Sequence, residues 1–155
     1  MEAFGLGKSS EAAQYGPLGS EWVDVLKDIP LFSPLSKRQV RRIANLAKPQ
    51  RFAESSTIVR RGQRGETFFV ILDGEATVSV PKGKTSVLKA GDWFGELALL
   101  DGGPRSATVT ARTPVLAMRI ARRPFLKLVA SDSELALGLL RGLSERLRAA
   151  NVSSD

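Results

Sequence analysis

TFFVILDGEATVSVPKGKTSVLKAGD, from Thr67 to Asp92, is the stretch whose pattern best indicates the fold. Apolar side chains alternate along its first half, and a period of two is typical of β-strands. Asp73-Gly74 predicts the turn of a β-hairpin, and Lys82-Gly83-Lys84 predicts a second turn. The alternating sets are Phe68, Val70 and Leu72 on one parity and Phe69, Ile71 and Asp73 on the other.

The same short period continues on both sides of this stretch. RFA and STIVRRG precede it, at 51–53 and 56–62, and SATVTARTPVLAMRI follows it at 106–120. About 70 residues therefore contain seven or eight short strands, with no helical spacer long enough for a parallel crossover. This arrangement predicts an antiparallel roll or barrel and excludes an α/β fold.

Helical patterns flank the strands. Before them, a short helix is expected from Ser20 to a stop at Pro30, and a second helix is expected between a Ser36 N-cap and Pro49. In the second helix, one apolar face consists of Val40, Ile43, Ala44 and Ala47.

Two more helices are expected after the strands. The first carries Pro124 in its first turn, where proline is tolerated, and the second has Ser133 as its N-cap. The last helix carries an apolar stripe suited to packing on the roll or on another helix: Ala136, Leu140, Leu143 and Leu147.

Length and composition indicate one globular domain. The chain has 155 residues, of which 43% are hydrophobic, so it is long enough to bury a core. Residues 1–19 are rich in Gly, Ser and Ala without a sustained period, and we expect them to form a flexible arm. The predicted organisation is this arm, a domain over residues 20–150 and a tail over residues 151–155.

Absent residue types exclude several chemistries. The chain has no cysteine and no histidine, which rules out disulfides, thiolate or histidine metal sites and every Ser-His triad. Cupin-type enzymes share the small roll but need histidine ligands, so we expect neither an enzyme nor a metal site. No signal peptide or membrane helix is visible, and we expect a soluble, cytoplasmic protein with no membrane partner.

The net charge of +7 makes anionic partners plausible. The cations lie on separate predicted elements, in Lys37 to Arg42, at Arg60, Arg61 and Arg64, and in Arg119 to Arg123. A transcription factor would need a helix-turn-helix after the long final helix, whereas only five residues follow Ala150. Specific DNA binding is therefore not expected.

The stretch WFGELALLDGGPRSATVTA, from Trp93 to Ala111, combines a carboxylate, a guanidinium and glycines. One Arg can neutralise a phosphodiester with two parallel donors, and a carboxylate can accept from a ribose hydroxyl. In an alternative interpretation, Glu96 and Arg105 form a solvated ion pair on a surface hairpin. The joint spacing of Phe-Gly-Glu, an apolar half-turn and Pro-Arg favours the ligand site.

With helices in front, a roll in the middle and a long final helix, the chain resembles the cyclic nucleotide-binding domain family. The resemblance covers roughly Trp22 to Ala150 and is most specific in the phosphate-binding cassette, supported by Gly62 to Val78 and by KAGDWFGE before Glu96. It implies an α+β, mainly β fold, in which an eight-stranded antiparallel β-roll (jelly roll) is flanked by N-terminal helices and two C-terminal helices. The ligand-binding residues that it implies are Phe94, Gly95, Glu96, Leu97, Ala98, Arg105, Ser106, Ala107 and Val109.

Each residue type suits the ligand that the resemblance implies. Arg105 would bind the phosphate, and Glu96 would accept from the ribose 2′-hydroxyl while lying near Arg105. Gly95 would leave room for the sugar, and a short helix starting near Glu96 would direct N–H groups toward the phosphate.

The base end of the ligand is less well determined. Ser106 directly after the arginine occurs in adenine-binding relatives and can also favour guanine, and we expect cAMP, with cGMP as the second choice. Many relatives stack an aromatic side chain of the C-terminal helix on the purine, but no aromatic residue follows Phe125. Cover for the base would then come from Leu139 or Leu143, or by cation–π contact from Arg141 or Arg146.

The sequence thus predicts a stand-alone, non-enzymatic regulatory protein that binds cAMP without a cofactor. Binding would tighten the cassette and move a hinge near Arg122 to Leu128 together with the final helix, and so act on a protein effector whose identity is unknown. Two alternatives are the sensor portion of a transcription regulator and a dimerising scaffold module that no longer binds nucleotide. The homodimer seam would be Leu140, Leu143 and Leu147.

Overall fold

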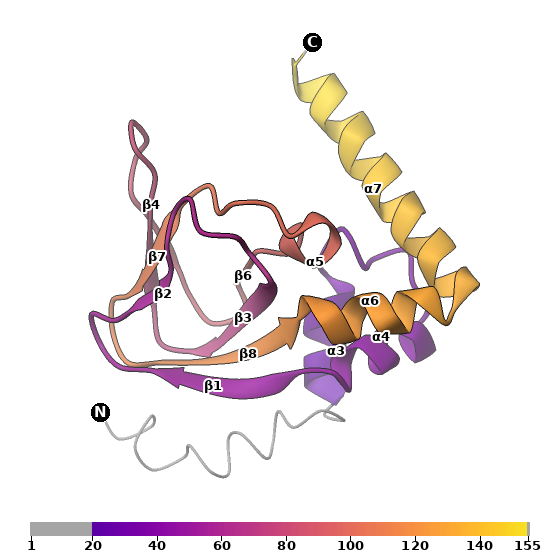
Figure 1. Cartoon of the computed structure of the whole chain (residues 1–155), viewed down its shortest axis with the longest axis horizontal. Coiled ribbons are helices and arrows are strands. Elements are labelled where there is room, and N and C mark those ends of the chain that lie inside the picture. The colour runs from indigo at the N-terminus through magenta and orange to yellow at the C-terminus, as the bar shows by residue number, and fades with distance from the viewer. Residues whose placement is uncertain (1–19, 155) are drawn as a thin grey trace.

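Two four-stranded antiparallel sheets dominate the computed structural model, which describes residues 20–154 (Figure 1). The strand order is β1-β8-β3-β6 in one sheet and β2-β7-β4-β5 in the other. These sheets and the flanking helices confirm the predicted roll, whereas the arm expected at residues 1–19 lies outside the described residues. The strands are β1 Lys48–Phe52, β2 Thr57–Val59, β3 Thr67–Asp73, β4 Ala76–Ser79, β5 Ser86–Leu88, β6 Trp93–Phe94, β7 Thr108–Ala111 and β8 Val115–Ala121.

The turn at Asp73-Gly74 does not form the predicted hairpin. It connects β3 to β4, and these strands belong to different sheets. Gly74 has φ +92°, and a Cβ on it would overlap the Pro114 carbonyl oxygen, so the chain changes sheet by crossing closely over the β7–β8 connection. The turn predicted at Lys82-Gly83-Lys84 is confirmed, because it joins the paired strands β4 and β5.

Two helices precede the roll, α3 (Ser20–Lys27) and α4 (Lys37–Ala44). The predicted Ser36 cap is confirmed as a capping box with Gln39. The second helix ends at Ala44, however, earlier than predicted, and Pro49 lies inside β1. Proline is tolerated there because β1 is an edge strand that pairs only with β8.

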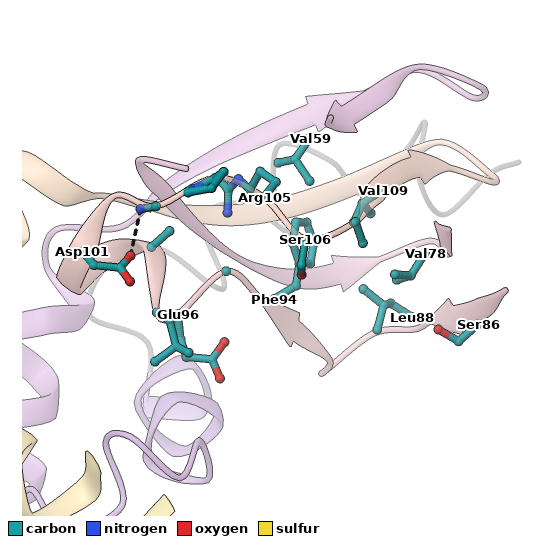
Figure 2. Close-up of a pocket in the computed structure, with 16 residues that line it drawn as sticks. Val59, Val78, Ser86, Leu88, Phe94, Glu96, Asp101, Arg105, Ser106 and Val109 are labelled. Atoms are coloured by element: carbon teal, nitrogen blue, oxygen red, sulfur yellow. Dashed lines mark hydrogen bonds between the residues drawn. The ribbon is translucent and has the colours of Figure 1, made fainter. Parts of the chain in front are cut away.

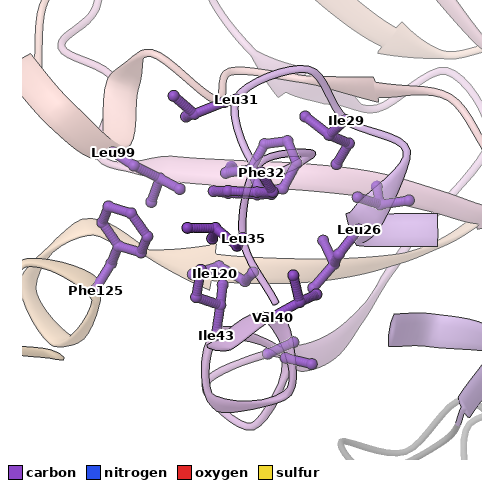
Figure 3. Packing of buried hydrophobic residues seen from close by; sticks show 14 of the residues in the cluster. Leu26, Ile29, Leu31, Phe32, Leu35, Val40, Ile43, Leu99, Ile120 and Phe125 are labelled. Carbon is purple, nitrogen blue, oxygen red and sulfur yellow. The ribbon is translucent and has the colours of Figure 1, made fainter. Parts of the chain in front are cut away.

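The alternation in β3 divides its side chains between two cores. Phe68 and Val70 face the helices, whereas Phe69 and Ile71 lie in the interior of the roll. In the helical core, the Phe32 ring packs 6.0 Å from Phe68 and 6.4 Å from Phe125, measured between ring centroids (Figure 3). Leu99 of the cassette belongs to this same core, which therefore connects the candidate site to the helices.

Two helices follow the roll, α6 (Arg122–Ala130) and α7 (Ser133–Ser154). The N-cap of α7 is Asp132 and not the predicted Ser133, because the Asp132 carboxylate accepts from the Leu135 N–H at 3.1 Å. The helix also continues to Ser154, through most of the segment expected to be a tail, and Asp155 lies outside the described residues.

Only part of the predicted apolar stripe of α7 packs within the chain, and its pairing with another helix stays a prediction. Leu140 and Leu147 are 59% and 65% exposed, and the packed face contains Leu135, Gly138 and Leu139 instead. A Cβ on Gly138 would overlap the Leu35 side chain, and one on Gly142 would overlap the Leu31 carbonyl oxygen. Glycine therefore lets α7 pack directly on the connection between α3 and α4, and a pattern of large apolar residues does not show that face.

Candidate functional site

A cavity of about 600 Å³ opens between the cassette and the sheet that contains β2, β4, β5 and β7 (Figure 2). Its volume is in the range of small-molecule sites. All nine predicted ligand-binding residues line it: Phe94, Gly95, Glu96, Leu97, Ala98, Arg105, Ser106, Ala107 and Val109. The sequence did not single out seven further lining residues as ligand-binding: Val59, Val78, Ser86, Leu88, Asp101, Gly103 and Pro104.

Arg105 is held by backbone on two sides. Its Nη2 donates to the Thr67 carbonyl oxygen at 2.7 Å, and its own N–H donates to the Gln63 carbonyl oxygen at 2.8 Å. Burial lowers the pKa of the guanidinium from its ordinary value. Arginine nevertheless stays cationic in proteins, so Arg105 places a positive charge with restricted mobility at one end of the cavity.

Two glycines make the space in which this guanidinium lies. A Cβ on Gly95 would lie 2.5 Å from Arg105 Nη1, and a Cβ on Gly65 would lie 2.8 Å from Arg105 Nε. Gly95 also has φ +85°, a conformation that side chains with a Cβ rarely adopt. The space at Gly95 was predicted for the sugar, and the structure shows that Arg105 occupies it.

Glu96 lies at the same end of the cavity but does not pair with Arg105. Its Oε2 accepts from Nη1 of Arg146, on α7, at 2.7 Å. The Glu96 side chain is only 16% exposed, and that of Arg146 is 36% exposed. The predicted mutual orientation of Glu96 and Arg105 is therefore replaced by a contact with a residue fifty positions along the chain.

The cassette helix α5 (Ala98–Asp101) is a single turn. The N–H groups of Ala98, Leu99 and Leu100 already donate within the turn, to carbonyl oxygens of Gly95, Glu96 and Leu97 at 3.0 to 3.2 Å. These three donors are therefore used within the turn. The expectation that N–H groups at the start of the turn, near Glu96, face the phosphate stays a prediction. The charge of Arg105 is a second feature of the site that suits a phosphate.

The far end of α5 rests on the first turn of α6. Arg122 Nη2 donates to the Leu100 carbonyl oxygen at 3.3 Å. A Cβ on Gly102, which ends α5 in a left-handed conformation, would lie 3.2 Å from Arg122 Nε. The cassette and the segment expected to act as a hinge are thus in direct contact.

The other end of the cavity is apolar. Strand register places Val59 opposite Val109, Val109 opposite Val78, and Val78 opposite Ser86. Residues directly opposite on antiparallel strands share a face, so these four form a row across the sheet, ending in a hydroxyl. Alternation in β4 shows that Val78 faces one side of a sheet, but only the strand register brings this row together.

None of the residues expected to cover the base lines the cavity. Leu139 is buried and Leu143 partly buried in the helical core, and Arg141 is exposed on α7. Arg146 is bonded to Glu96 at the rim. Cover for the apolar end is therefore not assigned to any of these four residues.

Within residues 20–154 there is no cluster of three or more carboxylate, imidazole or thiol side chains placed to hold a metal ion. Over the same residues, no helix combines the length and the apolar character that crossing a bilayer requires.

Comparison with known proteins gives a consistent result. The family model described as "Cyclic nucleotide-binding domain" matches residues 49–132. A curated relative, the cAMP-dependent protein kinase regulatory subunit of Colletotrichum orbiculare, is 32% identical over 127 residues, which are 81% of this chain and 30% of the relative. The chain thus spans less than a third of the length of that relative.

Two solved structures resemble this chain. One is the N-terminal domain of a transcriptional regulator from Streptomyces coelicolor, with a TM-score of 0.74 and 29% identity over 85% of this chain and 96% of that one. The other is the regulatory domain of Toxoplasma gondii PKA with cAMP, with a TM-score of 0.62 and 25% identity over 84% of this chain and 49% of that one.

Proposed function

This chain belongs to the cyclic nucleotide-binding domain family, and we propose that its roll binds cAMP, with cGMP as the second choice, in the cavity beside the cassette. The observation that carries the proposal is the guanidinium of Arg105, held by the Thr67 carbonyl oxygen and two glycines at the polar end of a cavity whose other end is apolar.

The two ends of the cavity complement the two ends of the ligand. A 3′,5′-cyclic phosphodiester carries one negative charge, which Arg105 neutralises with charge-assisted hydrogen bonds. The ribose 2′-hydroxyl donates to Glu96, and the purine packs over the valine row formed by Val59, Val109 and Val78. The remaining predicted residues of the cassette supply backbone and apolar surface around the sugar.

Fewer observations bear on the choice between adenine and guanine. The Colletotrichum relative is named for cAMP, and the Toxoplasma structure contains cAMP, which favours adenine. Ser106 and Ser86 both line the cavity and offer hydroxyls that a guanine edge could also use, which keeps cGMP as the second candidate. Titration of the same protein sample with each nucleotide decides between them.

The contacts of the cassette with the helices support a regulatory role. Leu99 packs in one core with Phe125 of α6, and Arg122 bonds the end of α5, so a movement of the cassette reaches α6 and α7. We assign the chain a non-enzymatic role, in which nucleotide binding shifts the population of α6 and α7 positions recognised by a protein effector. The stand-alone role and the homodimer through α7 stay predictions, and the likeness to a domain of a transcriptional regulator keeps the sensor of such a regulator as the alternative.

The test of this proposal is isothermal titration of cAMP into the wild-type chain and into Arg105→Ala. We expect the variant to bind about 10- to 150-fold more weakly, because one charged hydrogen-bonding group contributes about 1.5 to 3 kcal/mol. Arg61→Ala is the matched control, since Arg61 is exposed in the neighbouring loop and does not line the cavity. Unchanged affinity in Arg105→Ala would refute the site, and absence of binding to both nucleotides by the wild type would refute the function.

A further inference from the structure

A second, smaller cavity adjoins the one beside the cassette. Its volume is about 220 Å³. Arg105 and Val59 line both cavities, so the two spaces meet at these side chains. Small-molecule sites usually exceed about 300 Å³, and the second cavity is therefore too small for a nucleoside but large enough for a small ion.

The lining of this second cavity is rich in positive charge. Arg60, Arg64 and Arg105 contribute three guanidinium groups, against one carboxylate, that of Glu66. Arg60 and Arg64 are exposed, and within residues 20–154 neither side chain takes part in a hydrogen bond or an ion pair. The Glu66 carboxylate therefore neutralises neither of them, and the cavity favours an anion.

The loop of residues 60–64 is bound to the cassette through its backbone. The Gly62 N–H donates to the Arg105 carbonyl oxygen at 2.9 Å, and the Arg105 N–H donates to the Gln63 carbonyl oxygen at 2.8 Å. These bonds keep the loop beside Arg105. Because they join main-chain atoms, substitution of a loop arginine removes none of them.

Phosphate matches this set of donors better than a spherical ion such as chloride. A guanidinium presents five N–H donors in a planar fork, and the oxygens of a phosphate can accept from such a fork in pairs. The Nη2 atom of Arg105 donates to the Thr67 carbonyl oxygen, which leaves other donors of that group for an anion. The side-chain amide of Gln63, which also lines the cavity, adds uncharged donors.

We propose that the cavity lined by Arg60, Arg64 and Arg105 binds inorganic phosphate, and that bound phosphate weakens the binding of cAMP in the neighbouring cavity. The effect on cAMP rests on the proposed function, whereas the phosphate site does not. Two anions that share one guanidinium compete for its donors and repel each other. Because coupling between two sites is reciprocal, cAMP weakens the binding of phosphate by the same factor.

The test is isothermal titration of cAMP at a series of phosphate concentrations, with sodium chloride added to keep the ionic strength constant. Constant ionic strength removes the general screening of charge, so the remaining effect belongs to phosphate. We expect saturating phosphate to lower the affinity of the wild type for cAMP about fivefold. The phosphate dissociation constant follows from the concentration dependence of this fall.

Arg60→Ala and Arg64→Ala test the assignment of the cavity. Each should raise the phosphate dissociation constant about tenfold, the effect of losing one charge-assisted hydrogen bond. In phosphate-free buffer, both should keep the wild-type affinity for cAMP, because neither residue lines the larger cavity. Arg61→Ala is the matched control, since Arg61 is an exposed arginine of the same loop that lines neither cavity, and it should leave both constants unchanged.

Amide chemical shifts measured by NMR without cAMP supply a second measurement. Phosphate should shift the amides of residues 60–66 in the wild type and in Arg61→Ala at the same concentrations. In Arg64→Ala, the same shifts should need about tenfold more phosphate.

Three results would overturn the inference. The first is an effect of phosphate no larger than that of chloride, and the second is a rise in cAMP affinity with phosphate. The third is an equal phosphate dissociation constant in Arg60→Ala, Arg64→Ala and the wild type, which would place the phosphate at Arg105 in the larger cavity. In each case a wild type that binds cAMP in phosphate-free buffer leaves the proposed function standing. A wild type that binds neither nucleotide, but whose residues 60–66 respond to phosphate, refutes the proposed function and not the phosphate site.

Discussion

Arg105 lies where it does because two residues near it have no side chain. The Gly95→Ala substitution places a Cβ 2.5 Å from Arg105 Nη1 and 3.0 Å from the Thr67 carbonyl oxygen. The carbonyl cannot yield, so the guanidinium must leave the position in which it would meet a phosphate. We expect isothermal titration to show cAMP binding about tenfold weaker or worse, together with a stability loss of about 1 to 2 kcal/mol from the positive φ in urea unfolding.

Gly91→Ala separates the effect of a positive φ on stability from the effect of a Cβ on the position of Arg105. Gly91 has φ +94°, and a Cβ on it would meet nothing within 4 Å. This variant should lose a similar amount of stability and keep its affinity for cAMP. If both variants bind equally well, the space at Gly95 does not control the position of Arg105.

At the residue scale, the sequence predicted side chains that do line one cavity, but not all of their partners. The types and spacing of Glu96 and Arg105 were sufficient to predict that both line one cavity, because a phosphate and a sugar hydroxyl demand those groups. The partner of Glu96 could not be predicted, since Arg146 is fifty residues away and only the path of α7 brings it there. Gly95 was assigned to the ligand because a glycine shows that space is needed and not what fills it.

At the scale of elements, Arg122 joins the end of α5 to the start of α6. Its Nη2 bonds the Leu100 carbonyl oxygen, and its guanidinium packs against Gly102. Truncation in Arg122→Ala removes both contacts, and we expect urea unfolding to show a loss of about 1 to 2 kcal/mol, the usual cost of losing a hydrogen bond to a charged group and its packing.

The neighbouring Arg123→Ala is the control, because Arg123 is exposed in the same turn of α6. It should change stability by less than about 0.5 kcal/mol. The Nε atom of Arg122 is buried without a hydrogen-bond partner among the described residues, and this opposes part of the gain. A neutral or stabilising Arg122→Ala would mean that this desolvation outweighs the contacts and that α5 and α6 are not joined by Arg122.

Local patterns predicted the elements better than their pairing. Alternation in β3 predicted two faces, and the structure uses both, one for the helices and one for the interior of the roll. The Asp73-Gly74 turn was interpreted as a hairpin because the sequence shows where a chain turns but not which sheet the next strand joins. In α7, the stripe of leucines did not indicate the face that packs on the α3–α4 connection, because large apolar residues are more conspicuous than the glycines that make this contact.

At the scale of the whole molecule, α7 contacts both the helical core and the site. Leu135 and Leu139 anchor it in the core, Gly138 and Gly142 bring it onto the α3–α4 connection, and Arg146 reaches the cassette. The contacts of Gly138 and Gly142 therefore set the direction of the helix, and this direction places Arg146 beside Glu96. A small displacement at Gly142 moves Arg146 because a helix is stiff over a single turn.

Gly142→Ala tests whether close packing at Gly142 controls the position of Arg146. Two effects of opposite sign on the stability of the protein compete in this variant. Alanine favours a helix over glycine by about 1 kcal/mol, but the new Cβ would overlap the Leu31 carbonyl oxygen, which belongs to backbone and cannot rotate away. Overpacking of this kind costs about 1 to 3 kcal/mol, so the net change in urea unfolding should be a loss. Displacement of α7 should also separate Arg146 from Glu96 and weaken the binding of cAMP in isothermal titration. Ser144→Ala, at an exposed position of the same helix, should gain slightly in stability and keep its affinity for cAMP. A Gly142→Ala variant that is more stable and keeps its affinity for cAMP would show that α7 does not depend on close packing at Leu31 to bring Arg146 to Glu96.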